Sequence, residues 1–130
     1  MGKANSNAVV LDAGALIAFE RADPRMRALC REALRIRGRL VIPAGVVGQV
    51  WRGPARQVSI HALLAGPVTE VPPLDQVLAE ASGTLCGRTG TSDVVDASVV
   101  LTARRERAVI VTSDIDDLRR LDPKAVLERI

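Results

Sequence analysis

Two short apolar runs, each closely followed by an aspartate, constrain the possible folds of this chain more than any other feature. The run at 8–11 has the sequence AVVL and leads directly to Asp12, and the run at 108–111 has the sequence AVIV and is followed by Asp114. Short continuous runs rich in valine and isoleucine are typical of strands that are buried on both faces. We therefore predict two buried strands, each with an acid near its carboxyl end.

Helical patterns separate these runs and alternate with further strand-like segments. We predict strands at 8–11, 39–42, 67–71, 108–111 and 125–127. The spacing of apolar residues and the position of capping residues predict helices at 13–20, 24–37, 43–53, 57–64, 74–86, 93–105 and 116–121. Ser92 is expected to cap the helix at 93–105, and 87–91 to form a loop. This alternation indicates an α/β fold with a central, mainly parallel sheet of four to five strands, covered by helices on both faces.

Length and composition fit an ordinary globular protein. The 130 residues suit a single domain spanning 1–130, and 48% of them are hydrophobic. Only 2% are aromatic, so the core must be aliphatic, and binding of nucleic acid by aromatic stacking is disfavoured. Cys30 and Cys86 lie in apolar helical segments and are expected to be buried free thiols. The polar N-terminus and the lack of a membrane-length apolar run favour a cytoplasmic protein without membrane association.

Aspartates gather where a sheet of this kind would bind a ligand. Parallel sheets bind ligands at the carboxyl ends of their strands, so Asp12 and Asp114 are expected to share one crevice. Asp93 and Asp96 share a face in the first turn of a predicted helix, and Asp117 closely follows Asp114. Crowded carboxylates repel each other unless a cation neutralises them, and their hard oxygens select Mg²⁺ or Mn²⁺. Such an ion suits phosphodiester hydrolysis, because it polarises a phosphoryl oxygen and lowers the pKa of bound water.

Each aspartate also has a purely structural interpretation. Asp93 could stabilise a helix dipole, and Asp114 could cap a helix or form an Asx turn. Asp12 is the hardest to explain in this way, because a carboxylate after a buried strand needs a partner.

Other chemistries have little support. The only histidine, His61, lies in an apolar helical segment where partial burial is expected, and no catalytic triad, phosphate-binding glycine loop or zinc spacing is present.

The net charge of +3 comes from a chain in which almost all of the 18 basic side chains are arginines. Arginine pairs bidentately with phosphate, so the charge fits a nuclease, but a solvated arginine-rich surface explains it equally well. Arg52 or Arg88 could clamp phosphates. A receiver or phosphatase domain with a nucleophilic aspartate would need a nearby lysine, and Lys3 and Lys124 are both close to the termini.

Four segments resemble, in order and spacing, the landmarks of a PIN domain, and most closely those of the VapC toxins of bacterial toxin–antitoxin pairs. They are VVLDAGALIA at 9–18, VIPAGVVGQVWRG at 41–53, TSDVVDASVVLTA at 91–103 and VIVTSDIDDL at 109–118. Each motif is short, but together they cover nearly the whole chain. The chain is therefore similar to the PIN-domain ribonucleases of the VapC family.

This resemblance implies a three-layer α/β/α sandwich and an endoribonuclease that depends on Mg²⁺ or Mn²⁺ and cleaves structured RNA such as tRNA or rRNA. It also implies a homodimer and a VapB-like antitoxin that silences the site. The family's first acidic residue falls on Asp12, its third on Asp96 with Asp93 as a neighbour that could share the role, and its fourth on Asp114. Asp117 is a possible alternative ligand.

The family's second acidic residue is usually a glutamate, and here Gln49 occupies that position. An amide oxygen can still bind a metal, but it carries no charge. Three interpretations remain open: activity persists with weaker metal binding, Asp93 compensates, or the chain acts mainly by binding an antitoxin or RNA. Gln49 could also be an ordinary helix-surface residue. The neighbouring Trp51 is expected to serve packing or an interface.

Overall fold

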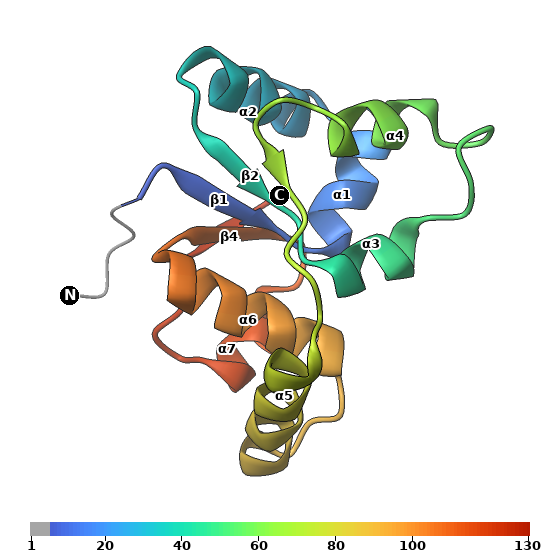
Figure 1. Cartoon of the computed structure of the whole chain (residues 1–130). Coiled ribbons are helices and arrows are strands. Elements are labelled where there is room, and N and C mark those ends of the chain that lie inside the picture. Colours follow the sequence, from blue (N-terminus) through green and yellow to red (C-terminus); the bar gives the residue numbers. More distant parts are fainter. Residues whose placement is uncertain (1–5) are drawn as a thin grey trace.

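The computed structural model describes residues 6–130, which form a five-stranded sheet with helices on both faces (Figure 1). The strands are β1 (Ala8–Leu11), β2 (Arg39–Val41), β3 (Thr69–Glu70), β4 (Val109–Thr112) and β5 (Leu127–Arg129). They lie in the order β3-β2-β1-β4-β5, and every neighbouring pair is parallel. The predicted α/β fold with a central parallel sheet is confirmed.

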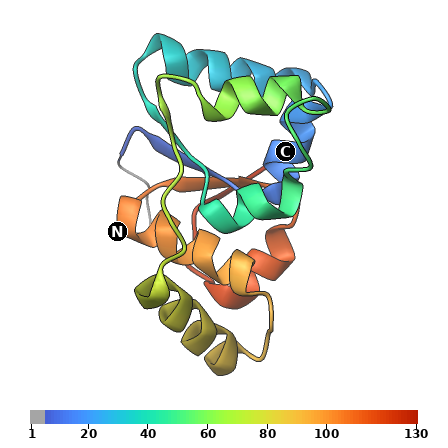
Figure 2. The same cartoon turned by 45° about the vertical axis from the view of Figure 1, so that its right-hand side comes forward.

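Helices form one layer on each face of this sheet. They are α1 (Ala13–Glu20), α2 (Pro24–Arg35), α3 (Ala44–Val50), α4 (Val58–Leu64), α5 (Gln76–Thr89), α6 (Val94–Glu106) and α7 (Ile115–Leu121). Figures 1 and 2 show α1, α2, α3 and α4 on one face and α5, α6 and α7 on the other. The arrangement is the three-layer sandwich that the resemblance implied. Within residues 6–130, no helix combines the length and the apolar character needed to cross a membrane.

The two apolar runs form the centre of the core, as their sequences indicated. Val10 and Leu11 of β1 and Ile110 and Val111 of β4 are all fully buried, because helices cover both faces of these adjacent strands. Cys30 and Cys86 are buried free thiols, as expected. The centre of the sheet is therefore built from aliphatic side chains, and its rigidity fixes the two strand ends that carry Asp12 and Asp114.

Several predicted element boundaries are wrong for identifiable reasons. The segment 87–91 is not a loop, because α5 continues to Thr89 and ends at Gly90, whose φ of 74° supplies the left-handed conformation that closes a helix. Asp93, not Ser92, caps α6. Helix α3 ends at Val50, because the buried Gln57 side chain donates to the Val50 carbonyl at 2.9 Å and accepts from the Arg52 N–H at 2.6 Å.

A close approach at Gly14 ties the start of α1 to the loop after β4. A Cβ atom at this position would lie 2.1 Å from the Ser113 Oγ and 3.2 Å from the Ser113 Cβ. Only glycine fits there without a shift of the neighbour. The contact joins the segments that carry Asp12 and Asp114, so it controls the spacing of the two acids.

Replacing Gly14 by alanine is expected to destabilise the protein by about 1–3 kcal/mol, the usual cost of overpacking. The cost should be smaller in a Ser113→Ala background, because the nearest atom, the hydroxyl oxygen, is then absent. Urea unfolding of the wild type, both single variants and the double variant measures this difference. Equal costs of Gly14→Ala in both backgrounds would contradict the close approach.

Candidate metal centre

Three carboxylates from two helices on the same face of the sheet converge at one point. Asp96 lies in the first turn of α6, Asp114 follows β4 at the start of α7, and Asp117 lies in the first turn of α7. One oxygen of each residue lies within 4.8 Å of the oxygens of the other two. A separation of this size lets one small cation contact all three residues. Asp114 and Asp117 are exposed and Asp96 is half-buried, so the cluster opens to solvent.

Asp12 stands beside this cluster at the end of β1. It is buried, and its Oδ1 accepts a hydrogen bond from the Ala15 N–H at 2.9 Å, which caps α1. Burial raises the pKa of Asp12, while hydrogen bonds with the Thr112 side chain and with the Ala15 and Gly14 backbone oppose this rise. The negative charge of Asp12 in turn raises the pKa of Asp96, so the two carboxylates are electrostatic neighbours.

Thr112 connects the two strand ends chemically. Its side chain is fully buried, hydrogen-bonds with the Asp12 carboxylate, and accepts the Asp114 backbone N–H at 2.8 Å. A single hydroxyl can donate to a carboxylate and accept from an amide at the same time. Thr112 therefore orients Asp12 and fixes the backbone that presents Asp114.

The cluster carries more negative charge than its surroundings neutralise. Burial is the largest cause that raises the pKa of Asp96 to about 7 from its ordinary value of 3.8, and four neighbouring carboxylates add to it: Asp93, Asp12, Asp114 and Asp117. The pKa of Asp114 is raised as well, mainly by burial and further by a hydrogen bond with Asp117 and by the negative charge of Asp117. A divalent cation among these oxygens would lower both pKa values and remove the repulsion. The donor set, made of hard carboxylate oxygens, fits Mg²⁺ or Mn²⁺.

Asp93 has a structural role in addition to its place beside the cluster. Its Oδ1 accepts the Asp96 backbone N–H at 2.9 Å, so it is the N-cap of α6. This cap holds the first turn of α6 in place and thereby orients Asp96. Asp93 also contributes the largest of the charges that raise the pKa of Asp96. The predicted proximity of the two residues is confirmed, although capping rather than a shared helix face produces it.

Gln49 is exposed on α3 and makes no side-chain hydrogen bond within residues 6–130. It lies one turn after Gly45, where an added Cβ would be 3.2 Å from Val95, the residue before Asp96. Because residues four apart share a helix face, Gln49 is on the side of α3 that faces the start of α6. The acidic cluster forms without it.

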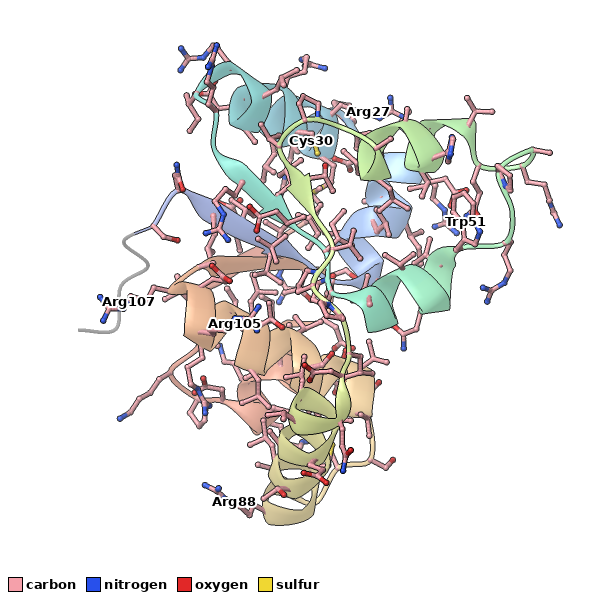
Figure 3. All side chains as sticks on the ribbon, viewed as in Figure 1. Arg27, Cys30, Trp51, Arg88, Arg105 and Arg107 are labelled. Carbon is pink, nitrogen blue, oxygen red and sulfur yellow. The ribbon has the colours of Figure 1, made fainter. Side chains whose placement is uncertain are left out.

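Two ring side chains near α3 and α4, Trp51 and His61, lie outside the group of converging carboxylates. Trp51 is half-buried against the core, as expected for a packing residue, and Figure 3 shows it between α3 and α4. Its ring centroid lies 6.0 Å from that of His61. The prediction that His61 is partly buried is wrong, because its side chain lies on the exposed surface of α4. Neither residue reaches the aspartates that converge at the strand ends.

A pocket of about 410 Å³ adjoins the acidic cluster. Its lining comes from the loop before α6, the first turn of α6 and helix α7: Gly90, Thr91, Ser92, Asp93, Asp96, Asp117, Arg120 and Leu121. The pocket therefore combines three carboxylates with one guanidinium group. Sequence patterns gave no signal for Arg120, since nothing in the run DDLRR distinguishes its two arginines without the phase of the helix.

Comparison with known protein families assigns this architecture. The family model described as the PIN domain matches residues 9–124. The chain belongs to the PIN domain family. PIN domains are generally nucleases, and those nucleases generally use divalent metals. The matched range contains every aspartate of the cluster.

Solved structures share the PIN fold at low sequence identity. The VapBC2 complex from Rickettsia felis, bound to a DNA fragment from its promoter, contains a chain with a TM-score of 0.70 and 15% identity, covering 95% of this chain and 98% of that one. FitAcB from Neisseria gonorrhoeae gives a TM-score of 0.60 and 16% identity, covering 92% of this chain and 95% of that one. At such identities the likeness establishes the fold. No curated protein sequence matches the chain.

The raised pKa of Asp96 predicts a pH-dependent effect of Asp96→Asn on stability. The folded protein keeps a proton on Asp96 up to about pH 7, whereas the unfolded chain releases it near 3.8. The ionised carboxylate therefore destabilises the metal-free fold increasingly as the pH rises from about 4 through 7. We expect Asp96→Asn to raise Tm by a few degrees at about pH 8 and to have little effect at about pH 4.

Thermal unfolding in EDTA across this pH range measures the effect. Asp116→Asn is the matched control, because Asp116 is exposed on α7 and lies outside the cluster of three carboxylates. An offset between wild type and Asp96→Asn that is the same at both ends of the pH range would contradict the raised pKa.

Proposed function

We propose that this PIN domain is a metal-dependent endoribonuclease and the toxin component of a type II toxin–antitoxin pair. The observation that carries the proposal is the convergence of Asp96, Asp114 and Asp117 within 4.8 Å, beside the buried Asp12, at the carboxyl ends of adjacent parallel strands. Structural roles alone do not explain a cluster of carboxylates whose pKa values are raised and which no basic side chain within residues 6–130 offsets.

Some of these side chains would bind a cation, and others would position the ligands. Asp96, Asp114 and Asp117 would bind Mg²⁺ or Mn²⁺, and Asp12 would add a buried negative charge beside them. Thr112 and Asp93 would act as positioning residues, since they orient Asp12 and Asp96 through hydrogen bonds. When bound, such a cation polarises a phosphoryl oxygen and lowers the pKa of water, which supports hydrolysis of a phosphodiester.

The choice of substrate and partners rests on the resemblance to VapC toxins and on the charge. A chain with a net charge of +3 that carries a local acidic centre suits a polyanionic substrate held by arginines around a metal. The resemblance adds structured RNA as the target, a VapB-like antitoxin and a homodimer. The likeness in fold to a chain of the VapBC2 complex supports the antitoxin partner. A toxin of this kind would act in the cytoplasm.

Cleavage should depend on the three converging carboxylates and on the divalent ion. Asp117→Asn is expected to lower cleavage of total RNA in Mn²⁺ or Mg²⁺ by about 100-fold or more, because even residues behind metal ligands cost about 10–100-fold when changed. Asp12→Asn should behave similarly, and EDTA should abolish the activity. Asp116→Asn, one residue away on the exposed side of α7, should cleave like the wild type. Equal loss in Asp116→Asn and Asp117→Asn would reject the assignment of Asp117.

A second candidate function is binding of antitoxin or RNA with little turnover. The observation in its favour is Gln49, which leaves α3 without a carboxylate on the side that faces Val95 and the start of α6. The observation against it is that three carboxylates meet without any contribution from α3.

Changing Gln49 to glutamate separates the two candidates. If the missing carboxylate cripples the centre, Gln49→Glu should tighten Mn²⁺ binding and raise cleavage by about tenfold or more, because each added carboxylate strengthens a hard-cation site. If the three converging aspartates suffice, both quantities should stay within about twofold. Calorimetric titration of Mn²⁺ and an RNA cleavage assay on the two proteins give the answer, and wild-type cleavage that already exceeds a metal-free control would favour the nuclease.

A further inference from the structure

We propose that Arg120 binds a phosphate of the RNA substrate next to the phosphate that is cleaved. This inference rests on the proposed nuclease function and assigns a substrate-binding residue to it. Arg120 lies on α7 three residues after Asp117, so the two side chains share a helix face. Both line the pocket of about 410 Å³, in which Arg120 is the sole basic residue.

Among the described residues, no side chain or carbonyl pairs with the guanidinium group of Arg120. Within residues 6–130, Arg120 makes no ion pair and no side-chain hydrogen bond, although Asp116 and Asp117 stand four and three residues before it. An exposed arginine that lines an acidic pocket without pairing is available to an anion from solution.

Some other arginines of the chain are engaged in ion pairs. Arg39 bridges Glu70 and Glu106 at 2.7 and 2.9 Å, and Arg104 pairs with Asp122 at 3.1 Å. Other arginines, such as Arg21, Arg31 and Arg119, make no such pair within residues 6–130. Arg120 differs from them because it is the arginine that lines the acidic pocket.

The two arginines that the sequence suggested as phosphate clamps are poorly placed. Arg52 donates to the Trp51 carbonyl at 2.7 Å and lies near α3, outside the acidic pocket. Arg88 projects outward at the far end of α5, as Figure 3 shows, and does not line the pocket either. Of these three arginines, Arg120 is the one whose position beside the acidic cluster suits phosphate binding.

The chemistry of the pocket explains why a phosphate is the expected ligand. A polyanion that approaches several carboxylates is repelled, and a single divalent cation offsets only part of that charge. A guanidinium group donates two parallel hydrogen bonds to a phosphate, which fixes the position of the phosphate as well as adding attraction. The backbone of Arg120 is held firmly, because Leu118 and Leu121 on the same short helix are both buried in the core. A neighbouring phosphate bound there would align the RNA with the aspartates.

The test compares Arg120→Ala with Arg119→Ala, which removes an adjacent arginine that does not line the pocket. The probe is unfractionated tRNA. The Kd of each protein for tRNA is measured in Ca²⁺ at several KCl concentrations, and kcat and KM for tRNA cleavage are measured in Mn²⁺. For Arg120→Ala we expect KM to rise about tenfold with kcat within about twofold, and the slope of log Kd against log salt to fall by about 1. Arg119→Ala should leave all of these values near wild type.

Arg120→Lys keeps the charge but not the fork, so it should retain the salt slope while binding less tightly than the wild type. Thermal unfolding confirms that each variant is folded. If the wild type cleaves tRNA but Arg120→Ala matches Arg119→Ala in KM and salt slope, the role of Arg120 is overturned and the nuclease function stands. If the wild type neither binds nor cleaves tRNA, both are overturned.

Discussion

The parallel pairing of β1 with β4 is the constraint on which the rest of the site depends. Val10 pairs with Ile110 and Leu11 with Val111, so the chain positions that follow, Asp12 and Thr112, emerge side by side at the same edge of the sheet. Both strands are buried on both faces, which leaves little freedom for a shift in register, since any slip would displace fully buried side chains. The hydrogen bond between Thr112 and Asp12 and the close approach at Gly14 then fix distances that the pairing has already limited.

This arrangement places acids where they oppose folding in the absence of a cation. A carboxyl such as Asp96, whose pKa rises to about 7, is less favourable when ionised in the folded protein than in the unfolded chain. The rigid aliphatic centre of the sheet tolerates this unfavourable charge because its burial supplies far larger stabilising terms. A cation that binds the cluster would restore the stability lost through the ionised carboxylates. The same charges would therefore link metal binding to the free energy of unfolding.

The sequence predicted the architecture well but the site only in part. Periodicity and apolar runs located the helices and the central strands, because burial on two faces leaves a strong pattern in strands such as β1 and β4. The last strand was predicted at 125–127 but spans Leu127–Arg129. Boundaries failed where local signals competed, as at Gly87, an exposed helical glycine that resembled the stop signal supplied by Gly90. The resemblance named Asp12, Asp96 and Asp114. It gave Asp117 a secondary place, whereas the structure brings Asp117 into the tightest group. Distances between side chains on different elements depend on tertiary packing, which no local pattern encodes.

Helix α7 shows how a few buried residues decide which neighbours face the centre. Its sequence presents acids and arginines in adjacent pairs, and each pair contains one residue that lines the pocket and one that does not. Leu118 and Leu121 lie three residues apart and are both buried, so they set the rotation of the helix about its axis. That rotation puts Asp117 and Arg120 on the pocket side and leaves Asp116 and Arg119 outside. The acid proposed to bind the cation, Asp117, and the arginine proposed to bind a phosphate, Arg120, therefore lie one turn apart on a single short helix. A change in the burial of either leucine would displace both side chains together.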